Sequence, residues 1–165
     1  MNALALAAWL IAQPLILDGH GNAIARPLKA VDVIVQAANE TSLPSFFAAH
    51  LDVLAAHESG YHPALAGDCP GLPAGSLLCT RDRGAHACGA WQGLCSALPA
   101  SATPLDQARL AVRDLKRAID VCPEHPLFVY AAGHCARTRV AALYESEVAA
   151  ELARVMPAAE LAVQP

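Results

Sequence analysis

Apolar residues recur at helical spacing on both sides of one long stretch, residues 60–103, that is rich in glycine, proline and cysteine. Alanine, at 37 of 165 residues, strengthens the helical signal because it has the highest helix propensity. The glycine- and proline-rich stretch is unsuited to long helices or strands, and long loops inside compact domains are usually functional. The pattern predicts a single, mainly α-helical domain with one long loop region, in which a small β-hairpin can form.

Local start and stop signals predict where the helices begin and end. Gly60 should end a helix, because glycine readily adopts the left-handed conformation found just beyond helix C-termini. Thr103, Pro104 and Asp106 form a helix start: an N-cap, a proline at the first helical position and an acid three residues after the cap. Apolar spacing then predicts helices over residues 28–40, 44–59, 104–121, 126–132 and 138–155.

The N-terminal residues 1–17 form an apolar run that is interrupted by Pro14. The run resembles the apolar part of a signal peptide, but the first basic residue is Arg26, so the usual basic start is missing. It is too short, and too interrupted, for a membrane span. A packed N-terminal helix is the alternative. We therefore divide the chain into an apolar leader, residues 1–27, and a domain, residues 28–160.

Six cysteines, at positions 69, 79, 88, 95, 122 and 135, bear on the compartment of the protein. No two of them have the CxxC spacing of a structural zinc site. An even number of cysteines in a small, loop-rich chain favours disulfides, and hence export to the periplasm, the extracellular space or a virion. The pairs Cys69–Cys79 and Cys122–Cys135 would each close a short loop. The alternative is buried, reduced thiols in a cytoplasmic protein.

Charge and aromatic content exclude one class of partner. The net charge is −4, the isoelectric point is about 5.9 and aromatic residues make up 5% of the chain. A nucleic-acid-binding domain normally has a basic patch, and one that binds single strands has aromatic residues for stacking. We therefore expect no nucleic-acid partner, and we expect the protein to be a monomer.

Glu58 is the residue whose position points most directly to chemistry. Phe47, Leu51 and Leu54 follow the spacing of one helix face, and position 58 is the next on that face. Glu58 also lies in the last turn of its helix, where the helix dipole disfavours a negative charge. Both burial and the dipole should raise the pKa of Glu58, as a general acid requires. The alternative is a carboxylate that reaches solvent at a frayed helix end.

Three short segments carry a family resemblance: His-Glu-Ser-Gly-Tyr at 57–61, Gly-Ala-Trp-Gln at 89–92 and Tyr-Ala-Ala-Gly at 130–133. In this order they resemble the motifs of lysozyme-like lytic transglycosylases, and the resemblance spans about residues 30 to 150. It implies a fold like that of goose lysozyme and cleavage of the MurNAc–GlcNAc bonds of peptidoglycan. No metal or cofactor is implied.

The resemblance also implies roles for single residues. Glu58 would be the catalytic acid and then base, Ser59 would help to position the substrate, Gln92 would line the glycan cleft and Tyr130 would form a hydrogen bond near the acid. The chain departs from the family pattern at Ala131, where an asparagine is usual, at Val129, where an alanine is usual, in the middle of the second motif, and in its longer spacing between the first two motifs.

Two aromatic side chains and two basic ones have further possible roles. The ring of Trp91 would suit stacking on a sugar, and a core tryptophan is the alternative. Tyr130 has the same alternative, as a core residue with its hydroxyl hydrogen-bonded. Arg81 and Arg83 would suit the carboxylates of peptidoglycan, with solvated loop charges as the alternative.

The number of nearby acids separates two reactions. Ordinary glycosidases use two carboxylates, and near Glu58 the sequence offers only the loop residues Asp68 and Asp82. A single acid suffices when the 6-hydroxyl of the sugar, rather than water, captures the oxocarbenium-like intermediate. Lytic transglycosylases work in this way, so the resemblance implies a 1,6-anhydro product. If Asp68 or Asp82 positions a water molecule, the enzyme would be a lysozyme-type hydrolase instead.

Other interpretations use the same residues. His57-Glu58 resembles the start of a zinc-protease HExxH helix, but the next histidine is His62, beyond the glycine that should end the helix. A cysteine–histidine nucleophile, such as Cys135 beside His134, lacks a local signature. Three hypotheses for the whole protein remain. It is a glycan-cleaving enzyme, an inactive glycan-binding module of the same fold, or a disulfide scaffold unrelated to sugars. Such an enzyme could serve a phage, a secretion apparatus or the ordinary turnover of the cell wall.

Overall fold

The computed structural model describes residues 3–13, 15–41, 45–62, 87–94, 97–98 and 101–156. The fold is mainly α-helical, as predicted. Its helices are α1 (Ala3–Ala12), α2 (Leu28–Glu40), α3 (Ser45–Ser59), α4 (Pro104–Val121), α5 (Pro126–Ala132) and α6 (Arg139–Val155). Its strands are β1 (Leu15–Leu17), β2 (Ala23–Ala25), β3 (Ala87–Cys88) and β4 (Gly93–Leu94).

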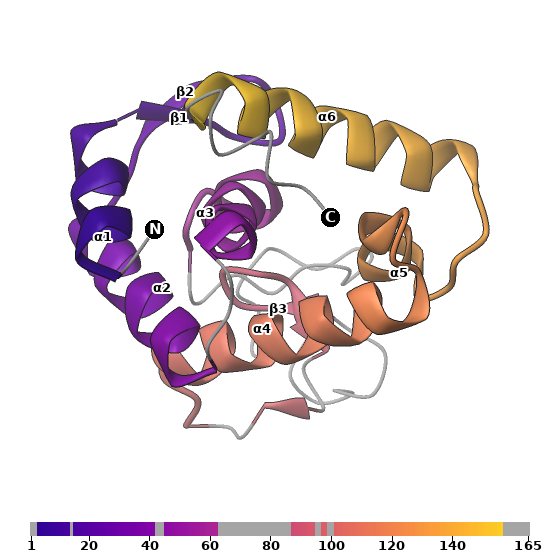
Figure 1. The fold of residues 1–165 in the computed structure, drawn as a ribbon, viewed down its shortest axis with the longest axis horizontal. Helices are drawn as coiled ribbons and strands as arrows, with labels where there is room; N and C mark the ends of the chain where they lie inside the picture. The colour runs from indigo at the N-terminus through magenta and orange to yellow at the C-terminus, as the bar shows by residue number, and fades with distance from the viewer. Residues whose placement is uncertain are drawn as a thin grey trace, which may run out of the picture.

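Helix α3 lies at the centre of the molecule, where the other helices surround it (Figure 1). All residues from 48 to 56 are buried, so the helix has no solvent-facing side along this length. The expectation of a single buried stripe was therefore too narrow: Leu51 and Leu54 are buried, as predicted, but so are their neighbours on the other faces. A helix that is buried on every side lacks the amphipathic periodicity that sequence patterns detect.

The predicted helix ends are confirmed, and their caps explain them. Thr103 and Asp106 form a reciprocal capping box at the start of α4, with Pro104 as the first helical residue. Thr138 caps α6 through its side chain, which accepts a hydrogen bond from the amide of Ala141 at 3.0 Å. Gly60 follows α3 with a φ of 60°, in the left-handed region.

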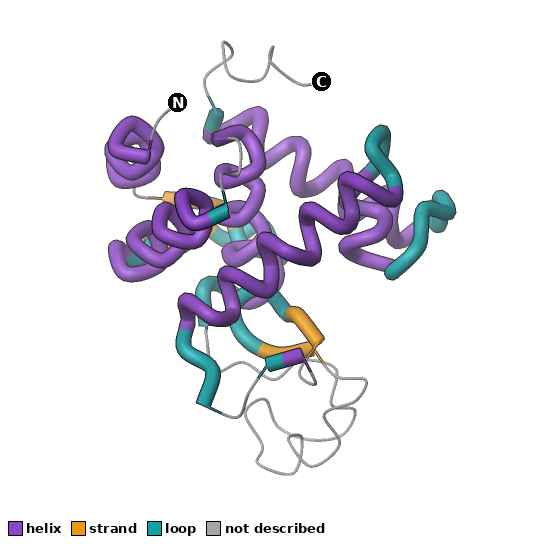
Figure 2. The backbone as a smooth tube through the Cα atoms, turned by 60° about the horizontal axis from the view of Figure 1, so that its bottom comes forward, coloured by secondary structure: helices purple, strands orange, loops and turns teal. Residues whose placement is uncertain are grey.

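Two short hairpins complete the described fold. β3 and β4 pair antiparallel beside α4, and they are the small hairpin expected in the loop region (Figure 2). β1 and β2 also pair antiparallel, with Ile16 opposite Ile24, and this hairpin was not predicted. Its turn is held by the Asp18 carboxylate, which accepts hydrogen bonds from the backbone amides of residues 20 and 22.

The N-terminal segment expected to be a leader packs into the same core. Leu10 in α1 and Ile16 in β1 are both 0% exposed, and α1 packs against α2. This arrangement is the one that the alternative, a packed N-terminal helix, predicts. Within the described residues, no helix is long and apolar enough to cross a membrane.

The disulfide predicted between Cys122 and Cys135 is present. It joins the end of α4 to the loop after α5 and so closes a loop that contains the whole of α5. Cys88 is also disulfide-bonded. The predicted pair Cys69–Cys79 lies outside the described residues.

Candidate active site

The three motif segments, which are far apart in the sequence, meet at the C-terminal end of α3. The Ser59 hydroxyl donates a hydrogen bond to the carbonyl oxygen of Ala90 at 2.8 Å, which joins the first segment to the second. The Tyr130 hydroxyl donates to the carbonyl oxygen of Trp91 at 3.0 Å, which joins the third segment to the second. Residues from three regions of the chain are thus fixed around the helix end that contains Glu58.

Glu58 is half-buried, and its carboxylate has a defined partner. The Tyr144 hydroxyl, from α6, donates a hydrogen bond to Oε1 of Glu58. Burial, and then the charge of Glu58, raise the pKa values of both Tyr130 and Tyr144 well above the usual value of a tyrosine. Both phenols are therefore neutral near pH 7 and act as hydrogen-bond donors beside the acid.

His57 contacts the same tyrosine from the other side. Its ring meets the ring of Tyr144 edge-on, with centroids 5.0 Å apart and an interplanar angle of 75°. Its Nε2 atom lies 3.2 Å from Oε2 of Glu147, one turn further along α6. His57 thus helps to fix α6, and hence Tyr144, against the end of α3.

A tight turn places the second segment beside α3. Gly89 has a φ of 80°, and a Cβ atom at this position would collide with Oε1 of Gln107 in α4. That same oxygen accepts a hydrogen bond from the amide of Ala90 at 3.0 Å. Gln92 lies at the end of the turn with a φ of 48°, and its side-chain amide donates to the carbonyl oxygen of Gly89 at 2.8 Å. The positive φ and the approach of the Gln107 side chain both favour glycine at position 89.

Trp91 is a core residue, and this corrects its expected role in stacking on a sugar. Only 3% of its surface is exposed, so neither ring face is open to a pyranose. Its indole N–H donates to the carbonyl oxygen of Leu51 in α3 at 2.7 Å. Trp91 therefore anchors the second segment to the central helix, which is the alternative that the sequence left open.

The remaining predicted site residues are placed only in part. The Ser59 hydroxyl accepts a hydrogen bond from the His62 amide at 3.1 Å, so the side chain organises the helix end, and its contact with a substrate stays a prediction. That Gln92 lines a glycan cleft also stays a prediction. The loop residues Asp68, Arg81, Asp82 and Arg83 lie outside the described residues.

Two polar residues of importance were missed by the sequence analysis. Tyr144 lies three residues after Ala141 and four before Val148, both of which are 0% exposed. A tyrosine in this apolar stripe was a signal that its hydroxyl has a buried partner. Asp52, in α3, is also 0% exposed, and its Oδ2 atom forms an ion pair with the guanidinium of Arg26 at 2.7 Å. Because α3 is buried on every side, its sequence has no amphipathic period that would separate a buried Asp52 from one facing solvent.

A pocket of about 540 Å³ adjoins this region. It lies between the β1–β2 turn, α3 and α6, and His57 and Glu147 form part of its wall. Glu58 is not among its lining residues, so the pocket meets the site only through His57.

A metal centre has no support in the described part of the chain. No group of three histidine, cysteine or acidic residues there is arranged to hold an ion. His57 is paired with Glu147, and His62 is exposed beyond the end of α3. The two histidines of the incomplete HExxH pattern therefore do not share a helix.

Comparison with known proteins adds no relative. The chain matches no known protein-family model, no curated protein and no solved structure.

Proposed function

We propose that the chain is a lysozyme-like lytic transglycosylase that cleaves the MurNAc–GlcNAc β-1,4 bond of peptidoglycan, with Glu58 as acid and then base. The observation that supports it most is the meeting of three motif segments at one helix end. Ser59, Ala90, Trp91 and Tyr130 are joined there by two hydrogen bonds that span the three segments. The coincidence of three short sequence matches would not by itself bring these segments together.

The surroundings of Glu58 suit a general acid. The carboxyl group is half-buried at the end of a central helix, and the neutral phenol of Tyr144 orients one of its oxygens. A positioned carboxyl group is what proton transfer to a leaving oxygen requires. Tyr130 lies near enough for the charge of Glu58 to raise its pKa, and its hydroxyl, which donates to the carbonyl oxygen of Trp91, holds the second motif segment beside the acid.

The proposed reaction needs only this one acid. Glu58 gives its proton to the glycosidic oxygen, the bond from that oxygen to C1 of MurNAc breaks, and GlcNAc leaves with a free 4-hydroxyl. The Glu58 carboxylate then takes the proton of the MurNAc 6-hydroxyl, whose oxygen bonds to C1 and closes the 1,6-anhydro ring. No water is consumed. Asp52, the buried acid of the same helix, is bound to Arg26 and does not act as a second catalytic carboxylate.

We further propose that the protein works outside the cytoplasm. The Cys122–Cys135 disulfide supports this location, because disulfides persist mainly in oxidising compartments. The proposed substrate, peptidoglycan, is found there as well.

Mass spectrometry of purified peptidoglycan after incubation with the oxidised protein tests the proposal. Three proteins are compared: wild type, Glu58→Gln, and Glu124→Gln as a matched control in an exposed turn between α4 and α5. Wild type and the control should release muropeptides that end in 1,6-anhydro-MurNAc, and Glu58→Gln should release none.

The other outcomes separate the alternatives. Reducing ends in place of anhydro ends would make the enzyme a hydrolase. Co-sedimentation with peptidoglycan without any release would leave a glycan-binding module. Neither release nor binding by the folded protein would refute the proposal.

A further inference from the structure

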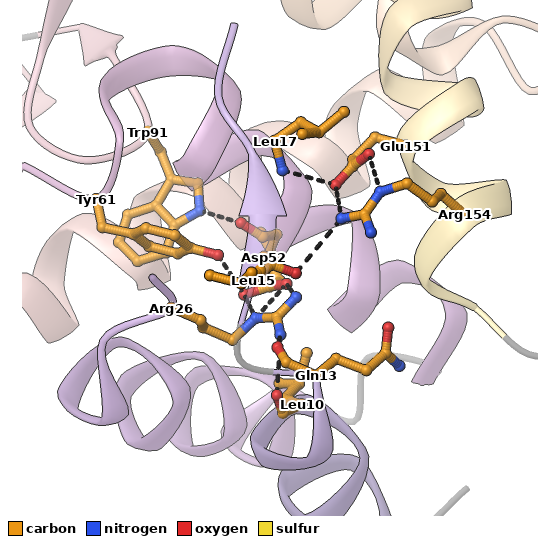
Figure 3. A network of polar contacts seen from close by, with 11 residues as sticks. Leu10, Gln13, Leu15, Leu17, Arg26, Asp52, Tyr61, Trp91, Glu151 and Arg154 are labelled. Carbon is orange, nitrogen blue, oxygen red and sulfur yellow. Dashed lines mark hydrogen bonds and ion pairs between the residues drawn. The ribbon is translucent and has the colours of Figure 1, made fainter. Parts of the chain in front are cut away.

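A buried ion pair joins the middle of α3 to the residue that follows β2. The Arg26 guanidinium donates to both oxygens of Asp52, at 2.7 to 3.0 Å, and also to the carbonyl oxygens of Leu10 and Gln13 at the end of α1 (Figure 3). The Tyr61 hydroxyl donates to Oδ1 of Asp52 at 2.8 Å. The Asp52 carboxylate therefore accepts hydrogen bonds from both Arg26 and Tyr61.

A buried ion pair is weak evidence for a stabilising role. Buried ion pairs can often be replaced by apolar residues without loss of stability. Burial raises the pKa of Asp52, while the hydrogen bonds from Arg26 and Tyr61 act in the opposite direction. Burial, and then the charge of Asp52, raise the pKa of Tyr61 far above its usual value, so the phenol is a permanent donor. The charged pair thus supplies one well-defined acceptor to a tyrosine that follows the end of α3.

Tyr61 has an unfavourable backbone conformation. Gly60 and Tyr61 have φ values of 60° and 66°. The amide of Gly60 donates to the carbonyl oxygen of Ala56 at 2.9 Å and the amide of Tyr61 to that of Ala55 at 3.0 Å, so both residues close the end of α3. Glycine adopts a positive φ freely, but a tyrosine does so only where the surroundings fix it. The bond from the Tyr61 hydroxyl to Asp52 supplies that constraint.

The same chain reversal determines where the site residues lie. Glu58 and Ser59 are the last two residues before it, and the Ser59 hydroxyl accepts a hydrogen bond from the amide of His62 while it donates to the carbonyl oxygen of Ala90. A change in the reversal at Gly60 and Tyr61 would therefore move both Ser59 and the neighbouring motif segment.

We propose that Asp52 and Tyr61 are positioning residues for Glu58: the buried carboxylate holds the Tyr61 hydroxyl and so fixes the turn on which Glu58 and Ser59 depend. Neither residue touches the reacting atoms. The expected effect on kcat rests on the proposed function. The expected effect on the turn rests on the contacts alone.

The experiment uses Tyr61→Phe, which removes only the hydroxyl, and Glu40→Gln as a control that removes an exposed arginine–carboxylate pair between α2 and α4. In Tyr61→Phe the amides of residues 60–62 should exchange with solvent at least about 10-fold faster than in wild type. The kcat for release of anhydro-muropeptides should fall about 10- to 100-fold, while KM changes little. The control should match wild type in both measurements.

Failure of the two proposals can be distinguished. If wild type releases no muropeptide, the proposed function fails. The exchange of the amides of residues 60–62 in Tyr61→Phe still tests whether the bond from Tyr61 to Asp52 fixes the turn. Wild-type exchange rates in Tyr61→Phe, or an unchanged kcat in an active enzyme, would overturn the inference. Should Tyr61→Phe fail to fold, Arg26→Lys weakens the hold on Asp52 and keeps the charge. It should show the same two changes to a smaller extent, and wild-type values in that variant would equally overturn the inference.

Discussion

Tyr144 in α6 donates a hydrogen bond to Glu58 at the end of α3, across 86 positions of sequence. The bond connects the last described helix to the central one at the point where the three motif segments meet. His57 reinforces it, because its ring packs edge-on against Tyr144. The orientation of the proposed acid therefore depends on where α6 docks.

Tyr144→Phe should lower kcat for muropeptide release by about 10-fold, because the Glu58 carboxyl group loses the donor that orients it. The variant retains the ring that packs against His57, so the free energy of unfolding should change by only about 1 kcal/mol. Initial rates and urea denaturation measure the two effects. A kcat equal to that of wild type would show that Glu58 does not need this bond.

Gly89→Ala should lower the free energy of unfolding by about 2–4 kcal/mol, because the new methyl group meets Gln107 and the residue must also keep a positive φ. Gly133→Ala is the matched control. It has a φ of 76°, and nothing lies within 4 Å of the added atom, so it should cost only about 1 kcal/mol. Urea denaturation of both variants tests the difference, and equal losses would contradict the close packing of the turn on Gln107.

Replacement of Cys122 and Cys135 together by serine should lower the free energy of unfolding by about 2–3 kcal/mol, because the unfolded chain gains entropy when a 13-residue separation is no longer closed. The loop contains α5 and hence Tyr130, so muropeptide release should fall as well. Denaturation in the absence of reductant compares this variant with wild type. An unchanged midpoint would show that the bond adds no stability.

Asp106→Asn should make stability less sensitive to acid. The hydrogen bonds from Thr103 lower the pKa of Asp106 below 3.8 in the folded state. Its stabilising contribution is therefore present above pH 3.8 and is lost as the pH falls through the lower, folded-state pKa. The asparagine retains an acceptor oxygen but has no charge, so the variant should be less stable than wild type at pH 6, and this difference should shrink as the pH falls through the lowered pKa of folded Asp106.

Urea denaturation at several pH values measures this difference in the free energy of unfolding between Asp106→Asn and wild type. Asp120→Asn, an exposed acid near the other end of α4, is the control and should show no such pattern. A constant difference between Asp106→Asn and wild type at all pH values would mean that the charge of Asp106 does not matter.

The limits of the helices could be predicted from the sequence because their causes are local. A cap acts within three or four residues, so Thr103 and Asp106 revealed the start of α4, and Gly60 revealed the end of α3. The pair Cys122–Cys135 was also predictable, since it closes a short loop. The β1–β2 hairpin was overlooked, although Asp18 and the two glycines after it form a recognisable turn between apolar residues.

The sequence by itself determined the helical fold class, the helix ends and the candidate acid, through propensity, capping and apolar spacing. Only the tertiary structure decided the surroundings of that acid: the donor from Tyr144, the burial of Trp91 and the Asp52 carboxylate beneath Tyr61. Burial depends on which distant segments cover a residue. Because α3 is covered on every side, its own sequence shows no face from which these partners could be identified.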